Sequence, residues 1–189
     1  AFALDCASSE LYDPEKGTYN FIDREISTDE LIGIIKGLTE KYDFLYIEDA
    51  VNENDWEGWQ RAAQQITRTV LIGDDLTVTN PKRLKKAQEL GIIGGFIFKP
   101  NQIGTITQSI EAHTFARAND WLTIPSARAG GVTDDVMSDF AVAFNCPCTK
   151  QGAPRTGDCI YGINFLTRAE DLNPGAKPFD FMPYAKFLK

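Results

Sequence analysis

The sequence predicts an α/β barrel of parallel strands, because short apolar runs alternate with amphipathic helices and several of these runs end in a polar side chain. These side chains are Asp5 in FALD, Glu48 in FLYIE, Asp74 in VLIGD and Lys99 in GFIFK. They are spaced by about 25 to 45 residues, roughly one strand–helix unit each. Since a barrel builds its site from the ends of several strands, three carboxylates and a lysine there indicate a divalent metal and a base.

The first half of the chain gives these signals in order. Residues 2–7 are typical of a strand, and a polar loop through Tyr19 and Asn20 leads to a helix over 29–41 with an apolar stripe on one face. Two more pairs of strand and helix follow: 44–50 with 55–66, and 69–75 with a helix that starts after Asn80.

That third helix has recognisable ends. Asn80 is a good N-cap, and Pro81 suits the first helical position, where its missing N–H costs nothing. Gly91 is typical of a residue that ends a helix. We therefore expect the helix to lie between Asn80 and Gly91.

The second half continues the alternation. Residues 94–100 form the fourth expected strand, closed by Pro100, and Thr105 can cap the next helix, over 105–120. The remaining expected elements are a strand at 121–127, a helix at 133–145, a strand at 146–153 and a helix at 163–172. Residues 173–189 contain three prolines and are expected to be irregular, which divides the chain into a barrel segment, 1–172, and a tail, 173–189.

An open, doubly wound sheet is the main alternative fold. Against it, no G-x-G-x-x-G follows the first strand and no G-x-x-x-x-G-K-[ST] occurs anywhere. The polar strand ends are also spread evenly along the chain, whereas a doubly wound sheet gathers its ligands at one switch point. Six strands alternating with five or six helices therefore favour the barrel.

Composition limits the classes of function. The chain has 189 residues, 43% of them apolar, and a net charge of −8. That charge argues against a general binder of nucleic acid or of membrane surfaces. No apolar stretch reaches the roughly 20 residues needed to span a bilayer, and no signal peptide is visible, so a cytoplasmic, reducing location is expected.

The cysteines and the single histidine carry little functional signal. Four cysteines in a chain of this length are expected to be reduced thiols, and the Cys146 and Cys148 pair lacks the second pair that a zinc site needs. His113 lies within an expected helix and is interpreted as an ordinary helix residue.

Longer motifs carry a family resemblance. The stretches ALDCASSELYDPEKGTYNF, YIEDAVNENDWEGWQ, GDDLTVTNPKRL, FKPNQIGTITQSI and TKQGAP closely resemble the C-terminal barrel of enolase, phosphopyruvate hydratase. The resemblance runs in register from about Ala3 to Leu172. It implies a TIM-type barrel and a Mg²⁺-dependent lyase of glycolysis that acts on 2-phosphoglycerate.

The resemblance also implies roles for individual residues. Asp5, Glu48 and Asp74 match the Mg²⁺ ligands, and Lys99 matches the general base that removes the carbon-bound proton. Two more basic residues match substrate-binding positions: Lys150 that of the lysine facing the substrate carboxylate, and Arg128 that of the arginine on the phosphate. For these two, an ordinary solvated basic side chain is the alternative. The neighbouring Asp49 and Asp75 are expected to support the ligands or to cap helices.

Several positions depart from the family pattern. The loop SARAGGVTDD places Ala127 and Ala129 where enolases have a histidine and a serine that contact substrate. Ala50 replaces a proline after I-E-D, and Pro100 replaces a valine after the base lysine. These changes predict weaker phosphate binding and a restricted backbone beside Lys99.

The chain also lacks parts that enolases have. The resemblance includes neither the N-terminal domain, with its catalytic acid glutamate, nor the first barrel elements. About six strand–helix units form an incomplete barrel, because eight strands are needed for closure. We expect that this chain is the C-terminal part of a longer protein, or that a protein partner covers the open edge, and that this segment alone is inactive.

Two functional hypotheses follow. In the first, the parent protein is an enolase with weakened activity that binds Mg²⁺ and a small phosphorylated substrate. In the second, it is a catalytically impaired relative, a pseudoenzyme, that serves as a structural or scaffolding component of a larger assembly. Neither hypothesis involves nucleic acid or a membrane.

Overall fold

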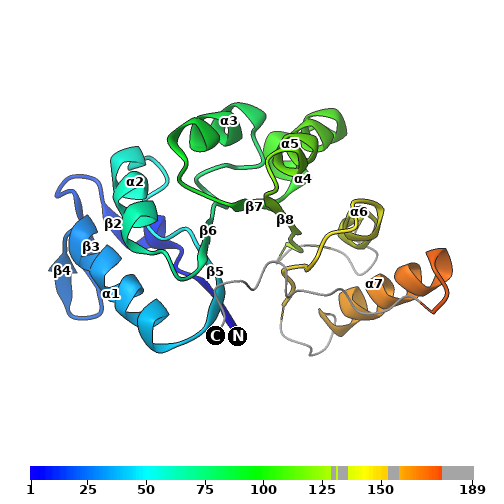
Figure 1. Ribbon diagram of the computed structural model, residues 1–189, viewed down its shortest axis with the longest axis horizontal. Coiled ribbons are helices and arrows are strands. Elements are labelled where there is room, and N and C mark those ends of the chain that lie inside the picture. Colours follow the sequence, from blue (N-terminus) through cyan, green and yellow to red (C-terminus); the bar gives the residue numbers. More distant parts are fainter. Residues whose placement is uncertain (129–130, 132–135, 153–157, 176–189) are drawn as a thin grey trace.

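The computed structural model of the chain describes residues 1–128, 131, 136–152 and 158–175. Its parallel strands form two groups, which hydrogen bonds join into one arc (Figure 1). The first group has the order β1–β5–β6, from Phe2–Asp5, Phe44–Glu48 and Val70–Ile72, and the second pairs β7, Gly95–Phe98, with β8, Leu122–Pro125. The prediction of an α/β fold with parallel strands is confirmed.

The junction between the groups lies at Gly73, just beyond β6. The Gly73 N–H donates to the Gly95 carbonyl at 3.3 Å, and the Ile97 N–H donates to the Gly73 carbonyl at 3.0 Å. At the far end of the arc, Lys150 forms an isolated parallel bridge with Ser126. The described strands thus follow the chain order of a barrel, but they do not close into one.

Helices cover the outer side of this arc (Figure 1). They are α1 at Thr28–Lys41, α2 at Trp56–Gln65, α3 at Pro81–Leu90, α4 at Pro100–Ile103, α5 at Ile106–Ala118, α6 at Met137–Ala143 and α7 at Asp158–Leu172. The expected signals at the ends of α3 are confirmed. Asn80 accepts from the Lys82 N–H, Pro81 is at N1, and Gly91 has the left-handed conformation, with φ 63°.

The two faces of the strands pack against different partners. Ile47 and Leu71 face the helices and share a core with Trp59, whereas Tyr46 and Ile72 belong to a second cluster on the opposite side. Because side chains alternate along a strand, Glu48 lies on the same side as Tyr46. The strand register therefore directs Glu48 away from the helices and toward the inner side of the arc.

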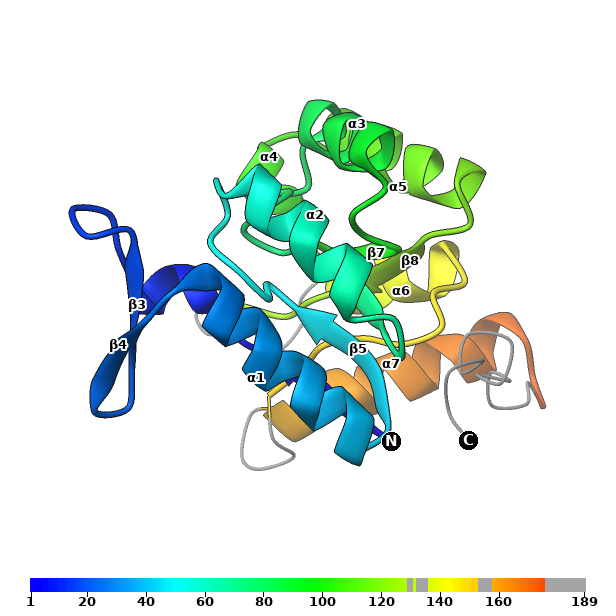
Figure 2. The ribbon, with the colours of Figure 1, turned by 60° about the vertical axis from the view of Figure 1, so that its left-hand side comes forward.

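One expectation for the first loop is wrong. The segment expected as a polar loop contains a short 3₁₀ helix, η1 at Ser8–Leu11, and an antiparallel sheet of β2, Tyr12–Asp13, β3, Thr18–Phe21, and β4, Arg24–Ile26. Figure 2 shows β3 and β4 at one side of the molecule, where β3 contacts η1 and α1. The sheet forms because Tyr19 and Ile26 are buried in the main core and Gly17, with φ 69°, permits the turn.

The sixth expected strand is also wrong. In the described part of 146–153, regular pairing is limited to the single bridge at Lys150, and Pro147 within the segment has no N–H for a ladder. Pro100 does not close a strand, because β7 already ends at Phe98 and Pro100 begins α4.

Other boundaries differ less. The final helix starts at Asp158, earlier than expected, and α6 covers Met137–Ala143 of the expected 133–145 helix, whose residues 133–135 lie outside the described residues. Of the expected tail, 176–189 lie outside them as well. In the part of the chain that the structure describes, no helix is both long and apolar enough to cross a membrane.

Candidate functional site

The carboxyl ends of the strands bring acidic and basic side chains together. Asp5 ends β1 and pairs in register with Glu48, which ends β5. The Lys150 ammonium donates to Asp5 Oδ2 and to Glu48 Oε1, each at 2.6 Å. The Lys99 ammonium donates to Asp74 Oδ2. Each of the three predicted metal ligands thus has a lysine as its counter-ion.

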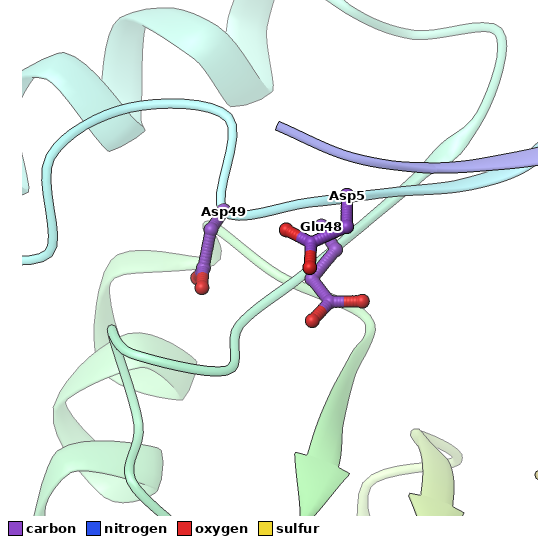
Figure 3. A group of neighbouring side chains, drawn as sticks. All are labelled: Asp5, Glu48 and Asp49. Atoms are coloured by element: carbon purple, nitrogen blue, oxygen red, sulfur yellow. The ribbon is translucent and has the colours of Figure 1, made fainter. Parts of the chain in front are cut away.

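The carboxylates form two overlapping groups with oxygen atoms close enough to share a cation. Oxygens of Asp5, Glu48 and Asp49 lie within 4.8 Å of one another, and so do oxygens of Asp49, Asp74 and Asp75. Figure 3 shows the first group, with the carboxylates of Asp5 and Glu48 side by side and Asp49 next along the chain. The three predicted ligands are therefore divided between two groups that share Asp49.

Two buried oxygens suit a hard divalent cation. Among the described residues, Glu48 Oε2 and Gln102 Oε1 are buried and have no hydrogen-bond partner. The Glu48 side chain is only 1% exposed, so bulk solvent does not reach the free oxygen. Carboxylate and amide oxygens are the ligands that Mg²⁺ prefers. On this criterion the residues fit the predicted ion.

Burial and ion pairing act against each other at Glu48 and Lys150. Burial raises the pKa of the Glu48 carboxyl, while the hydrogen bond and charge of Lys150 oppose that shift. Burial lowers the pKa of Lys150, but its hydrogen bonds to Asp5 and Glu48 outweigh burial and leave the pKa raised. Lys150 therefore remains protonated and holds the buried carboxylate in place.

Asp49, which the sequence predicts to support the ligands or to cap a helix, accepts hydrogen bonds from backbone N–H groups. It is 2% exposed and accepts from the Asp74 N–H at 3.0 Å and from the Asp75 N–H at 2.9 Å. Burial raises the pKa of its carboxyl to about 7, although both backbone hydrogen bonds favour the ionised form.

Hydrogen bonds hold both the backbone and the side chain of Lys99. Its N–H donates to Thr79 Oγ1 at 2.8 Å, and Gln102 Nε2 donates at 3.4 Å to Asp74, the carboxylate that also receives the Lys99 ammonium. The backbone of Lys99 is extended, with φ −137° and ψ 91°, as a following proline requires. The backbone restriction that Pro100 imposes therefore still allows the Lys99 ammonium to reach the Asp74 carboxylate.

The hydrogen bond described for Arg128 goes to Asn101 and not to a carboxylate. Its Nη1 donates at 3.1 Å to Oδ1 of Asn101, two residues after Lys99. The Ala127 N–H donates to the Lys150 carbonyl at 2.9 Å, so the loop after β8 adjoins the lysine. Ala129 lies outside the described residues.

Sequence reasoning assigned no role to Thr79 or Gln102. Both occur in motifs that carry the family resemblance, GDDLTVTNPKRL and FKPNQIGTITQSI, and this is the signal that could have found them. The burial of Thr79, its φ of 55° and its contact with Lys99 depend on the packing of two separate segments.

His113 and the cysteines, for which the sequence predicts no catalytic role, are part of the packed structure. His113 is buried, its Nδ1 lies 3.1 Å from Thr123 Oγ1, and its ring stacks on Phe144 with centroids 3.9 Å apart. It borders a cavity of about 630 Å³ lined by residues at the amino ends of β6, β7 and β8. This cavity is at the opposite ends of the strands from the carboxylates, which do not line it. Cys6, Cys146 and Cys148 are free thiols.

Comparison with known proteins agrees with this arrangement. Residues 1–179 match the family described as "Enolase, C-terminal TIM barrel domain". The chain is 41% identical over 170 residues to the enolase of Methanococcus maripaludis strain S2, covering 90% of this chain and 40% of that protein. It is 38% identical over 180 residues to the enolase of Methanopyrus kandleri, covering 95% of this chain and 42% of that protein. The chain spans about two fifths of the length of the curated relatives it matches, and it belongs to the enolase family, in the region that forms the C-terminal TIM barrel domain.

Proposed function

We propose that the protein to which this chain belongs is a Mg²⁺-dependent lyase that dehydrates 2-phosphoglycerate to phosphoenolpyruvate in glycolysis. The observation that carries the proposal is the meeting of two lysines with three strand-end carboxylates, one of which, Glu48, keeps a buried oxygen free. Family membership supports the choice of reaction.

In this proposal Asp5, Glu48 and Asp74 hold the ion. When bound, Mg²⁺ would stabilise the negative charge that develops on the substrate carboxylate. The free oxygen of Glu48 and the carboxylates that now pair with Lys99 and Lys150 would hold the ion.

Lys99 is the proposed general base. To accept the proton from the carbon next to the substrate carboxylate, it must first leave Asp74 and lose its own proton. Nearby positive charge favours a neutral amine over an ammonium ion. Lys150, at the isolated bridge beyond β8, is proposed to supply such charge and to neutralise the substrate carboxylate.

Substrate binding is proposed to be weakened at the phosphate. Arg128 can offer a planar guanidinium to phosphate oxygens. Alanine at positions 127 and 129 offers no side-chain hydrogen bond there. The acid that protonates the leaving hydroxide is proposed to come from outside this chain, so the segment by itself is expected to be inactive.

The proposal is tested by assaying the full-length protein for Mg²⁺-dependent formation of phosphoenolpyruvate. Lys99→Ala is expected to abolish the activity. Lys36→Ala is the matched control, because Lys36 forms an exposed ion pair with Glu40 on α1, away from the strand ends. Activity that survives Lys99→Ala unchanged contradicts the assignment of the base.

A structural role in an assembly is the second candidate. The arc is open, Phe2 on its edge strand β1 is 62% exposed, and Ile163 and Leu166 on α7 are 59% and 67% exposed. Covering these apolar side chains with another protein surface would be favourable. Light scattering on the full-length protein tests this role, and an active monomer would contradict it.

The cellular setting proposed with either function is a reducing, cytoplasmic one. The free thiols of Cys6, Cys146 and Cys148 are consistent with it.

A further inference from the structure

Asp49 connects the three strand ends that carry the predicted metal ligands. Its N–H donates to the Ile72 carbonyl of β6 at 3.1 Å, and its carbonyl accepts from the Ser8 N–H, just beyond β1, at 3.3 Å. Its side chain accepts from the N–H groups of Asp74 and Asp75. This one residue, at the end of β5, is thus hydrogen-bonded to the end of β6, to the segment that follows β6, and to the start of η1 beyond β1.

The backbone of Asp49 is adapted to this position. In a regular strand, the residue after Glu48 would point toward the helices. Asp49 instead adopts the left-handed conformation, with φ 46°, which ends the strand and turns its carboxylate under the segment that carries Asp74. Aspartate and asparagine tolerate this conformation better than most residues do.

The two carboxylate oxygens of Asp49 have separate partners. Oδ1 accepts from Asp74 at 3.0 Å and Oδ2 accepts from Asp75 at 2.9 Å. Among the described residues, the adjacent Glu48 has a buried oxygen without a hydrogen-bond partner, Oε2. The free acceptor at this strand end is therefore on Glu48, while the oxygens of Asp49 are used to hold the next strand end.

We propose that Asp49 is a positioning residue of the metal site: it sets the distance and orientation of Asp74 relative to Glu48 and Asp5 without itself ligating the ion. The proposal rests on the proposed function, since it assumes that these three carboxylates hold a divalent cation. Partners that orient metal ligands commonly contribute 10- to 100-fold to affinity.

The test uses the full-length protein and two variants. Asp49→Asn keeps the shape and the left-handed backbone but replaces one acceptor oxygen with an NH₂ group, and Asp49→Ala removes both acceptors. Calorimetry with Mg²⁺ is expected to show a loss of affinity of roughly 10-fold for the first variant and up to roughly 100-fold for the second.

Eu³⁺ luminescence separates positioning from ligation, because lifetimes in H₂O and D₂O count the water molecules bound to the ion. Both Asp49 variants are expected to keep the wild-type number of waters. Asp5→Ala, which removes a predicted ligand, is expected to gain at least one. A gain of one water in Asp49→Ala would make Asp49 a ligand and overturn the proposal.

Amide hydrogen exchange supplies a measurement that does not require the Asp49→Ala variant. The N–H groups of Asp74 and Asp75 should exchange slowly in the unsubstituted protein, and one of them faster in Asp49→Asn, so a poorly folded Asp49→Ala protein does not prevent a decision. Unchanged Mg²⁺ affinity in both variants overturns the positioning role alone. If the unsubstituted protein binds neither ion, both this role and the proposed function are wrong.

Discussion

Lys150 donates a hydrogen bond to Glu48 Oε1 at 2.6 Å, although 102 positions separate the two residues in sequence. The Glu48 side chain is 1% exposed and that of Lys150 30% exposed, so a buried anion is neutralised by a cation that reaches it from the rim. The same ammonium contacts Asp5. This contact links the end of β1 to the isolated bridge at the far end of the arc.

Replacing Lys150 with methionine should destabilise the protein without metal and increase the benefit of Mg²⁺. Removing the ammonium leaves Glu48 buried without a counter-ion, and because Lys150 is partly exposed we expect a loss of about 1–3 kcal/mol in the free energy of unfolding. Denaturant unfolding with and without Mg²⁺ measures both effects. A variant as stable as the wild type without Mg²⁺ would contradict the role of the ion pair.

Replacing Thr79 with valine should displace the proposed base. The change keeps the side-chain shape but leaves the partly buried Lys99 N–H without its acceptor, at a cost of about 1–3 kcal/mol. Misplacement of a catalytic group lowers kcat, here by roughly 10- to 100-fold, with a smaller change in KM. Thr79→Ser is the control, because it retains the hydroxyl. The interpretation fails if serine and valine variants have equal kcat values.

Stability should decrease below neutral pH through His113. Burial, aided by the charge of Arg117, lowers the pKa of His113 in the folded protein. The unfolded chain, with a histidine pKa of about 6.5, therefore takes up the proton first as the pH falls. The contribution of His113 is full above about pH 6.5 and is lost as the pH drops toward the lower folded pKa.

His113→Gln removes this titrating group, so the free energy of unfolding of the variant should depend less on pH below about pH 6.5. Denaturant unfolding of both proteins between about pH 5 and pH 8 checks it. Parallel pH profiles for the two proteins would mean that His113 does not contribute.

Replacing Gly95 with alanine should destabilise the sheet. A Cβ there would lie 2.8 Å from Leu122 Cβ and 2.9 Å from the Leu122 carbonyl oxygen, so strand β8 would have to move, at a cost of about 1–3 kcal/mol. Gly37→Ala on α1 is the matched control. Nothing lies within 4 Å of the added Cβ, and the change should stabilise the helix by roughly 0.5–1 kcal/mol. Thermal unfolding compares the two variants, and equal midpoints would refute the steric argument.

Local sequence signals were sufficient to predict most of the alternating strands and helices. Helix α3 could be placed between Asn80 and Gly91 because capping depends on a few adjacent residues. The small sheet of β2, β3 and β4 was missed because its strands are two to four residues long and are held by the burial of Tyr19 and Ile26 in a core that distant segments build. The strand predicted at 146–153 was wrong for the same reason, because the pairing of this segment depends on where β8 ends.

The sequence alone determined the alternation of strands and helices, the family, and the polar residues at successive strand ends, because these are properties of spacing and of residue type. Tertiary structure decided which of those residues meet. It placed Lys150 on Asp5 and Glu48, Lys99 on Asp74, and Asp49 under the backbone of Asp74. These contacts depend on strand register and on a left-handed turn at Asp49, and the free energies that fix them come from packing between segments far apart in the chain.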